Sequence, residues 1–380
     1  MRSKKICFTV SSPMTVNAFL RHHITELAKH YKISVIANIE DADTHSFRDL
    51  PLEEIIHVKI VRSISPKDDL LAIKKLTEIF RDRKFDAVHS VTPKAGLLAM
   101  TAAKRAGIRN RIHIFTGQVW FTKKGLFRKM LMEIDKLIVK AATQILVDGQ
   151  SQRHFLIQSN ILRADNSRVL GQGSISGVNE QRFTPSLSIR EKFRNELSFS
   201  PSDVVFAFLG RLNEDKGIRE LALAFSKLSK EFSGAKLFFI GYDEDHLMPF
   251  IESTVINKNA VLFYGPTHKP EELLQAADVF CLPSHREGFG TSVLEASLLG
   301  LPIICSDTYG LKETIIDDVT GFRHGVKNVD AIHQAMRTLN LDAGKRKVMG
   351  AAGRDYVLSN FTAQQITEEW LKFYADIFSR

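Results

Sequence analysis

The sequence predicts an α/β fold with two doubly wound units, each a parallel β-sheet covered by helices on both faces. The 380 residues exceed the about 250–300 that a single hydrophobic core usually supports. Short apolar runs alternate with stretches of helical spacing, and this alternation restarts after residue 200. Such alternation is typical of parallel sheets whose strands are connected by helices.

The first half of the chain contains four apolar runs that are short enough to be strands. Buried strands that are separated by helices indicate a parallel sheet with helices on both faces. The expected strands are 6–10, 33–37, 58–61 and 87–89, and the stretches with helical spacing between them include 16–30 and 70–80.

The second half repeats this pattern from residue 204 onward. The expected strands are 204–209, 236–240, 260–264, 279–282 and 302–305, and the expected helices are 217–232, 271–277 and 293–299. A polar, loop-like seam around Pro185 separates the two halves, which gives an N-terminal domain at 1–185 and a C-terminal domain at 186–360.

The last stretch, 361–380, is amphipathic and predicts one more helix. Its apolar stripe consists of Ile366, Trp370, Phe373, Tyr374 and Ile377. This helix could cap the second domain or cross back to the first, and we expect it to pack on the N-terminal domain.

Composition excludes several classes of protein but leaves the partner open. Hydrophobic residues are 44% and charged residues 25%, which excludes a disordered tail, a fibrous repeat and a polytopic membrane protein. Lysine and arginine outnumber the acids by 52 to 43, a net charge of +9. This surplus indicates a polyanionic partner, which can be nucleic acid, an anionic membrane or a phosphorylated substrate.

The three cysteines lie far apart in apolar runs. We interpret Cys7, Cys281 and Cys305 as reduced core thiols, which favours a cytoplasmic protein without a disulfide or zinc site. No uncharged apolar stretch approaches the roughly 18 residues that a membrane span needs, so membrane contact is expected to be peripheral.

The strongest motif is the glycine-bearing loop that follows the expected strand 279–282. Gly288 and Gly290 leave the backbone open, and Thr291 or Ser292 can cap the next helix. Free N–H groups and a positive helix end at such a loop suit a phosphate.

Two acidic residues lie at this expected phosphate-binding loop, and their side chains need partners other than phosphate. Sugar hydroxyls are natural partners: Glu295 could bind a ribose diol, and Glu287 the group to be transferred. The alternative is a capped surface helix with incidental acids. We favour the binding site because the whole string follows a buried strand.

A second motif follows the expected strand 204–209. Arg211 can fork onto phosphate oxygens and Lys216 supplies a mobile positive charge, so together they could neutralise a departing diphosphate. The alternative is a pair of solvated loop cations. Their position between a strand and a helix favours the functional interpretation.

These two strings, together with Phe239-Ile240-Gly241, Gly300-Leu301-Pro302 and Thr320-Gly321-Phe322, resemble the retaining glycosyltransferases of family 4. The resemblance implies the GT-B fold, in which two Rossmann-like domains face a central cleft. It implies transfer of a sugar from a nucleotide diphosphate with retention of anomeric configuration and without a metal or other cofactor.

The resemblance also assigns roles to residues of the second domain. Arg211 and Lys216 would hold the donor diphosphate and act in catalysis with Glu287, which would contact the donor sugar. The remaining donor-binding residues that it implies are Gly288, Gly290, Thr291, Ser292, Glu295 and Tyr264.

The string from His89 to Gly96 resembles the H-x-x-x-P-K-A-G motif of members that build bacterial surface polysaccharides on lipid carriers. It implies acceptor-side roles for His89 and Lys94, and for Thr116 after the next strand. The chain departs from the family in having Ser11-Ser12 where many members have a glycine pair.

A second departure concerns catalysis by histidine. Many members have a His-Gly pair where this chain has Thr116-Gly117. His113 is the nearest histidine, but in an extended run it shares a face with Phe115 and not with Thr116. We therefore interpret His113 as structural.

Part of the positive charge falls on a basic amphipathic segment, 120–140. Its lysines and arginine interleave with an apolar stripe, which suits an anionic bilayer. The alternative is a domain helix with its stripe in the core. The basic residues are Lys123, Lys124, Arg128, Lys129, Lys136 and Lys140, and the stripe is Leu126, Phe127, Met130, Leu131, Ile134, Leu137 and Ile138.

The resemblance thus implies a retaining glycosyltransferase that moves a sugar, of N-acetylhexosamine type, from a UDP-sugar to a polyprenyl-diphosphate-linked saccharide. The pathway would be O-antigen, capsule or related polysaccharide synthesis at the inner face of the membrane. The alternatives are a GT-B epimerase or phosphorylase, and a basic nucleic-acid-binding protein. The last lacks any stacking platform or reading helix, so no nucleic-acid partner is expected.

Overall fold

The computed structural model describes residues 3–39, 47–61 and 63–379, which divide into two compact units. Unit 1 is Met1–Gly177 together with Ala363–Arg380, and unit 2 is Val178–Thr362. The division falls before the expected boundary at 185. The reason is that the chain already joins unit 2 at Val178, whose N–H donates to the carbonyl of Phe361 at 2.9 Å.

Unit 1 contains a parallel sheet, and the described residues form seven strands in the order β3-β2-β1-β4-β5-β6-β7. The strands are β1 (Lys5–Thr9), β2 (Lys32–Ala37), β3 (Glu54–His57), β4 (Ala87–Val91), β5 (Asn110–Phe115), β6 (Gln144–Val147) and β7 (Ser167–Val169).

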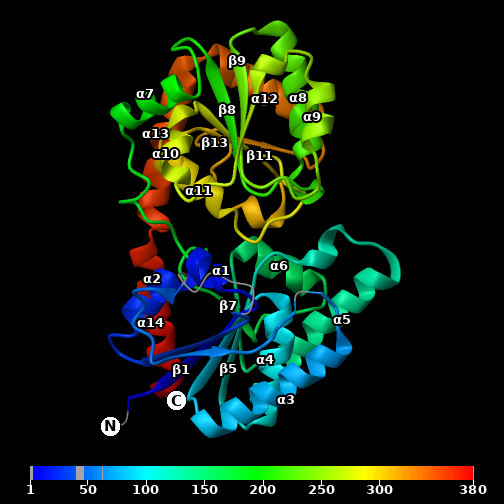
Figure 1. The fold of residues 1–380 in the computed structure, drawn as a ribbon, viewed down its shortest axis with the longest axis vertical. Coiled ribbons are helices and arrows are strands. Elements are labelled where there is room, and N and C mark those ends of the chain that lie inside the picture. Colours follow the sequence, from blue (N-terminus) through cyan, green and yellow to red (C-terminus); the bar gives the residue numbers. More distant parts are fainter. Residues whose placement is uncertain (1–2, 40–46, 62, 380) are drawn as a thin grey trace. The chain divides into compact units, whose positions relative to one another are not determined.

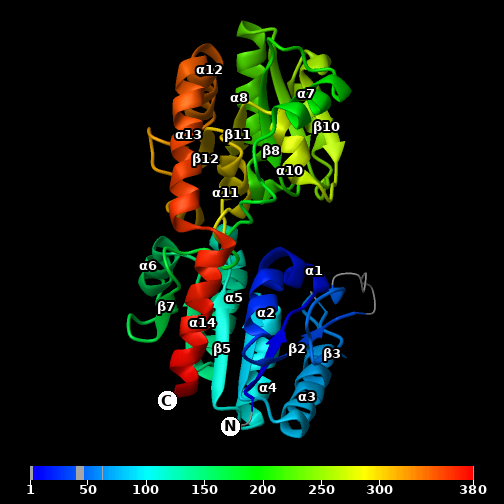
Figure 2. The ribbon, with the colours of Figure 1, turned by 90° about the vertical axis from the view of Figure 1, so that its left-hand side faces the viewer.

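Helices cover both faces of this sheet (Figures 1 and 2). One face packs on α3 (Pro66–Arg83), α4 (Pro93–Arg105), α5 (Gly125–Ala141) and α6 (Gln150–Gln158). The other packs on the continuous helical segment α1 (Pro13–Thr15), η1 (Val16–Leu20) and α2 (Arg21–Leu27), and on α14 (Ala363–Ser379). A short 3₁₀ turn, η3 (Val119–Thr122), precedes α5.

The strand expected at 58–61 is wrong, because the third strand, β3, lies just before it at Glu54–His57. This edge strand alternates between half-buried and exposed residues, so no continuous apolar run marks it. Val58 and Ile60 are buried but lie in the coil that follows.

Helix α14 belongs to unit 1 although it ends the chain. All five residues of its apolar stripe are buried there against β1 and α2, and Trp370 and Tyr374 are fully buried. The chain therefore leaves unit 1 at Gly177, forms unit 2 and returns to complete the core of unit 1.

Unit 2 repeats the parallel architecture, and its described residues form six strands in the order β10-β9-β8-β11-β12-β13. The strands are β8 (Val204–Leu209), β9 (Ala235–Ile240), β10 (Val261–Gly265), β11 (Val279–Leu282), β12 (Ile303–Ser306) and β13 (Gly321–His324). All five strands expected here agree with these bounds to within one residue. Strands β8 and β11 agree at both ends, β9 begins one residue earlier, and β10 and β12 are each shifted by one residue, whereas β13 was not expected.

The helices of unit 2 form two layers around the sheet (Figure 1). One layer contains α8 (Ile218–Glu231), α9 (Met248–Thr254) and α12 (Val329–Leu341). The other contains α7 (Leu187–Glu196), α10 (Pro270–Leu273), α11 (Thr291–Leu298) and α13 (Ala343–Asn360). Short 3₁₀ turns complete the unit: η4 (Glu214–Lys216), η5 (Lys258–Ala260), η6 (Leu274–Ala276) and η7 (Tyr309–Leu311).

Two further expectations concern the thiols and the membrane. Cys7, Cys281 and Cys305 are all free and buried, as expected of core thiols. Within the described ranges, every helix is too short or too polar to span a bilayer.

Candidate functional site

The loops after β8 and β11 meet at the carboxyl edge of the unit 2 sheet. These strands are neighbours, so their carboxyl ends lie side by side. Lys216 Nζ lies 2.5 Å from Glu287 Oε1, and the Ser284 hydroxyl donates to the same oxygen at 2.7 Å. Both charged side chains are largely buried, with 21% of the lysine and 11% of the glutamate exposed. The structure thus brings together two of the three predicted catalytic residues.

A second set of contacts holds the same two loops together. Arg286 Nε lies 2.8 Å from Asp215 Oδ2, and the His285 N–H donates to the Asp215 carbonyl at 2.7 Å. His285 also contacts Glu220 of α8 at 3.1 Å. No role was predicted for these residues from the sequence, although each lies close to a motif residue after a strand. That position is the signal by which they could have been found.

The two loops approach so closely that one position requires glycine. Gly217 follows Lys216 with φ of +69°, and a Cβ there would lie 2.1 Å from the carbonyl oxygen of Pro283. Glycine at this position therefore allows both the left-handed turn and the contact between the loops.

The helix after the β11 loop begins earlier than expected. Gly290 is its N-cap residue with φ of +63°, and Thr291 and Ser292 form its first turn. The expectation that a Thr291 or Ser292 side chain caps this helix is therefore wrong. The N–H groups of the first turn still face the loop end, which leaves them available to an anion. Gly288 lies in the loop, one residue after Glu287.

Glu295 lies one turn into α11 and is partly buried. Burial raises its pKa to about 7, an effect that the positive charge of Arg182 partly offsets. Near neutral pH this carboxyl is therefore poised between its protonated and ionised forms.

Arg211 and Tyr264 lie away from the Lys216–Glu287 pair. The Arg211 guanidinium is 56% exposed and forms two contacts with the Glu244 carboxylate at 2.6 and 2.8 Å, which Asn213 also contacts. Tyr264 is half exposed on β10, the edge strand that β9 and β8 separate from β11. The structure therefore does not bring these two predicted residues into contact with Glu287.

In unit 1, His89 lies in the core and not at a surface. It is fully buried in β4, its Nδ1 lies 2.8 Å from the Tyr374 hydroxyl, and its ring stacks on Trp370 at 4.9 Å. Burial lowers the pKa of His89 well below its usual range. His89 therefore cannot contact an acceptor, and the predicted acceptor-side role is wrong. The sequence could not reveal that α14 packs against this residue.

His113 is also buried, as the structural interpretation expects. Its Nδ1 lies 2.9 Å from the Ser90 hydroxyl and its ring meets Phe115 edge-on at 4.6 Å. Burial lowers the pKa of His113 to about 3, so it is neutral at physiological pH.

The other two acceptor-side candidates lie at the carboxyl edge of the unit 1 sheet but do not contact each other through any described bond. Lys94 opens α4 and donates to Asp69 at 2.6 Å and to the Ser63 carbonyl at 2.9 Å. Thr116 follows β5, and its carbonyl accepts from Gln152 at 2.8 Å. Lys94 thus fastens α3 to α4, which weakens a direct role on the acceptor.

Two short acidic segments, Asp41-Ala42-Asp43 and Asp243-Glu244-Asp245, could each be considered as metal sites, but their sequences are more simply those of acidic turns. No group of three potential ligands comes together within the described ranges. Asp243 accepts from the first N–H groups of α9, Glu244 binds Arg211, and Asp245 accepts from the Glu214 N–H. Asp41 and Asp43 lie outside the described residues.

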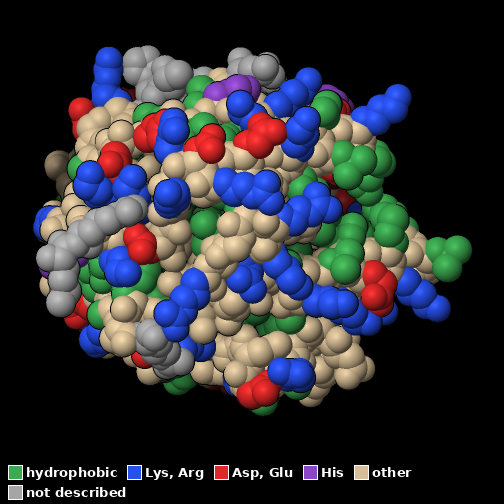
Figure 3. Space-filling model, turned by 90° about the horizontal axis from the view of Figure 1, so that it is seen from below, with side chains coloured by type: hydrophobic (Ala, Val, Ile, Leu, Met, Phe, Trp, Pro, Cys, Tyr) green, Lys and Arg blue, Asp and Glu red, His purple; other side chains and the backbone are tan. Residues whose placement is uncertain are grey.

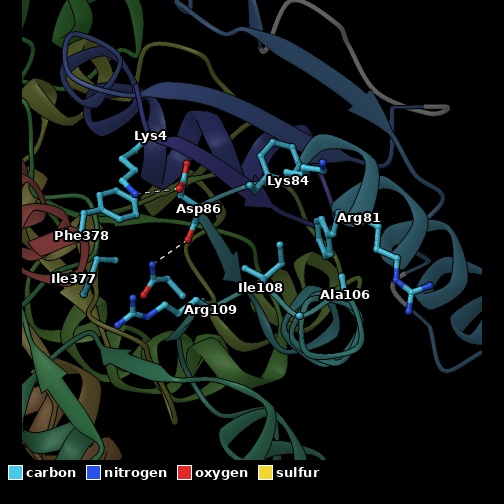
Figure 4. Close-up of a pocket in the computed structure, with 13 residues that line it drawn as sticks. Lys4, Arg81, Lys84, Asp86, Ala106, Ile108, Arg109, Ile377 and Phe378 are labelled. Atoms are coloured by element: carbon cyan, nitrogen blue, oxygen red, sulfur yellow. Dashed lines mark hydrogen bonds and ion pairs between the residues drawn. The ribbon is translucent and has the colours of Figure 1, made fainter. Parts of the chain in front are cut away.

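A cavity in unit 1 lies at the opposite, amino edge of its sheet (Figure 4). It has a volume of about 580 Å³, and Lys4, Arg81, Lys84 and Arg109 surround it. Asp86 closes one side by pairing with Lys4 at 3.2 Å. Ligands of doubly wound sheets bind at the carboxyl edge, so this cavity is separate from the predicted sites.

Two protein families match this chain, one in each unit. Residues 189–356 match the family "Glycosyl transferases group 1", and residues 15–173 match the "Glycosyl transferase 4-like domain". The chain belongs to the family-4 glycosyltransferases, enzymes with the GT-B fold.

The chain is similar to several named glycosyltransferases. The chain is 30% identical over 325 residues to the capsular polysaccharide biosynthesis glycosyltransferase CapM of Staphylococcus aureus, covering 84% of this chain and 85% of that one. It is 27% identical to a Campylobacter jejuni N,N'-diacetylbacillosaminyl-diphospho-undecaprenol α-1,3-N-acetylgalactosaminyltransferase, covering 88% and 89%. The crystal structure of Anabaena HepE with UDP and glucose matches with a TM-score of 0.82 at 16% identity, covering 98% and 99%.

Proposed function

We propose that this glycosyltransferase transfers a sugar of N-acetylhexosamine type from a UDP-sugar to a polyprenyl-diphosphate-linked saccharide, with retention of configuration. The product would enter O-antigen, capsule or related surface polysaccharide, made at the inner face of the membrane. The observation that carries the proposal is the Lys216–Glu287 pair beside the first turn of α11. The Campylobacter relative, whose name specifies a diphospho-undecaprenol acceptor, supports the acceptor class.

The donor would bind with its charges matched to the groups on the loops. Lys216 and the N–H groups at the start of α11 would face the diphosphate, and Glu287 would accept hydrogen bonds from the sugar hydroxyls. Glu295 would accept hydrogen bonds from the ribose. Arg211 would join the diphosphate after exchanging its contact with Glu244, which is exposed and therefore weak. The choice of UDP follows the Anabaena structure, which contains UDP.

The reaction would need no separate base and no metal. The bond from the anomeric carbon to the diphosphate oxygen breaks, and the acceptor oxygen bonds to the same face of that carbon. The acceptor proton passes to the leaving diphosphate. Lys216 and the α11 N–H groups stabilise the charge that develops on this leaving group, which is the contribution that the protein makes to the rate.

Substitution of Glu287 tests the site. We expect Glu287→Ala to lose about 10²-fold or more in turnover, because contacts to a reacting sugar act mainly in the transition state. Glu231→Ala is the matched control, because Glu231 is an ion-paired glutamate of unit 2 that lies on α8 beside α12. Undiminished turnover of Glu287→Ala would exclude the assignment.

A panel of nucleotide sugars tests the donor. The bound donor should raise the unfolding temperature, because a ligand that binds only the folded state stabilises it. Incubation without an acceptor should give neither an epimer nor a sugar phosphate, and the anomeric configuration of the first product reports retention. Full activity in excess chelator is expected, and its loss would contradict metal-independent transfer.

A further inference from the structure

Helix α5 presents an apolar stripe to solvent. Leu126, Met130 and Leu137 recur at helical spacing and are 83%, 41% and 53% exposed. In the described part of unit 1, five of the ten exposed large hydrophobic side chains fall between Val119 and Leu137. A surface that clusters apolar side chains in this way usually has a partner.

The apolar face of α5 is wider than the surface that packs on the core of unit 1, so part of this face is exposed. Ile134 and Leu131 pack inward beside the fully buried Ile138. The remaining apolar side chains continue around the helix onto the outer side. Three of the seven residues of the apolar stripe thus lie in the core and four are exposed, so packing in the core accounts for only part of the stripe.

The orientation of α5 is fixed by a polar contact on its inner side. The Trp120 indole N–H donates to the buried Asp135 carboxyl at 2.7 Å. Arg128 lies over the Trp120 ring at 5.3 Å, so this cation is already engaged. Rotation of α5 to bury Leu126 would break the Trp120–Asp135 bond, so the outward stripe is a stable feature of the fold.

Lysines border the exposed stripe on α5. Lys129 and Lys140 are exposed along one side of it, and Lys123 and Lys124 precede the helix. The one acid of the outer face, Glu133, is paired with Lys136 at 2.7 Å. In Figure 3, hydrophobic side chains gather at the right-hand edge of unit 1, where Figure 1 draws α5, with lysine and arginine side chains around them.

We propose that the outer face of α5, defined by Leu126, Met130 and Leu137 with Lys129 and Lys140, docks onto an anionic lipid bilayer. The apolar side chains enter the acyl boundary, and the lysines lie at the level of the anionic headgroups. Charge complementarity favours this occupant, because a second copy of the chain would place like-charged lysines against one another.

The location of α5 gives the docking face a purpose. The helix begins ten residues after β5 ends, so its first turns lie at the carboxyl edge of the unit 1 sheet. Ligands of such sheets bind at this edge. The inference rests on the proposed function for its purpose, because a lipid-linked acceptor must be reached from the bilayer, but its observations come from α5 alone.

Vesicle binding by the full chain tests the docking face. The probe is sedimentation with vesicles of phosphatidylcholine, with and without phosphatidylglycerol. The wild type should bind the anionic vesicles and release in high salt. Leu126→Ser/Met130→Ser/Leu137→Ser should bind about tenfold or more weakly, and Lys129→Gln/Lys140→Gln about fivefold weaker per lysine.

Matched controls carry the same changes on unit 2. Leu341→Ser/Val348→Ser removes apolar side chains that are equally exposed, and Lys230→Gln/Lys347→Gln removes two exposed lysines. Both should bind vesicles like the wild type. Thermal protection by the donor reports that each variant is folded.

Three results would overturn the docking face: no binding of the wild type to anionic vesicles, α5 variants that bind like the wild type, or a wild-type dimer that the α5 substitutions dissociate. Failure of the proposed function would give a different result. No sugar would be transferred even to a water-soluble acceptor, while vesicle binding would persist. If both hold, the α5 variants keep activity on a water-soluble acceptor and lose it on an acceptor embedded in vesicles.

Discussion

At the scale of single residues, the Lys216–Glu287 pair differs from an ordinary surface ion pair. Its two side chains are mostly buried, and the Ser284 hydroxyl shares the contact. A buried charge whose partner is removed is left uncompensated, whereas exposed pairs contribute little. The pair is therefore expected to matter for both the loop geometry and the reaction.

Lys216→Ala should lower turnover by about 10²-fold, because it removes the cation next to the leaving diphosphate. Lys227→Ala is the matched control, since Lys227 makes a similarly short contact of 2.6 Å with Asp330 but at the surface of the same unit. Steady-state kinetics of both variants check this. Equal losses in the two variants would show that general charge, and not the site, is responsible.

Glu295 should make both stability and donor binding depend on pH. Burial raises its folded-state pKa to about 7 from an ordinary 4.5, so the folded state holds a proton that the unfolded state releases. The stabilisation is therefore complete below about pH 4.5 and lost as pH rises through 7, by on the order of 1–3 kcal/mol. A ribose that binds the ionised form makes donor affinity rise over the same range.

Glu295→Gln checks both effects, because it keeps the shape of the side chain and removes the ionisation. Unfolding free energies and donor affinities measured from pH 5 to pH 8 should lose this pH dependence in the variant. A wild type whose donor affinity is flat across pH 7 would contradict the role on the ribose.

At the scale of elements, the contact between the loops after β8 and β11 positions the site. Gly217→Ala should separate these loops, because its Cβ would collide with the Pro283 carbonyl. Gly107→Ala is the matched control: it has a similar φ of +76° but nothing within 4 Å of its Cβ. The control should lose only about 1 kcal/mol of stability, while Gly217→Ala should also lose turnover. Similar kinetics in both variants would exclude the positioning role.

Helix α14 supplies one of the two buried tryptophans of unit 1. Trp370 is fully buried and stacks on His23 at 4.7 Å and on His89. Trp370→Ala should cost about 3–5 kcal/mol of unfolding free energy. Trp370→Phe should cost less, because it also removes a buried indole N–H that has no partner. Denaturant unfolding measures both, and equal losses would contradict this account.

Sequence patterns identified the elements whose signal is local. Strands β8 and β11 agree with their expected bounds, because each is a continuous apolar run that both faces of the sheet bury. The edge strand β3 was misplaced because only one of its faces is covered. Burial of His89 by α14 depends on residues that lie 285 positions apart in the chain, which no local pattern contains.

Part of the candidate site in unit 2 could also be predicted from the sequence. Lys216 and Glu287 follow strands that are neighbours in the sheet, so their meeting is a consequence of strand order. The contact of Arg211 with Glu244, by contrast, depends on the conformation of the loop after β9. Spacing along the chain does not determine that conformation.

At the scale of the whole molecule, the response of unit 1 to acid depends on buried groups that act in opposite directions. Unit 1 buries His23, His89 and His113 completely, and burial lowers the pKa of each, to about 3 for His23 and His113. A buried histidine whose folded-state pKa is depressed stabilises the fold above pH 6.5, where the unfolded state is also neutral. This stability is lost as pH falls, because only the unfolded chain takes up the proton.

Each of these histidines should therefore cost unit 1 about 2 kcal/mol between pH 6.5 and pH 5. Two buried carboxyls of unit 1 oppose this loss, because burial raises the pKa of Asp135 to about 7 and that of Asp148 to about 8. Each therefore stabilises the folded state by about 2 kcal/mol as pH falls over the same range. His23→Gln removes one destabilising group and leaves both aspartates, so the unfolding free energy of the variant at pH 5 relative to pH 6.5 should be about 2 kcal/mol higher than that of the wild type. Denaturant unfolding at the two pH values measures this difference, and an unchanged pH dependence in the variant would show that His23 does not contribute to the acid response.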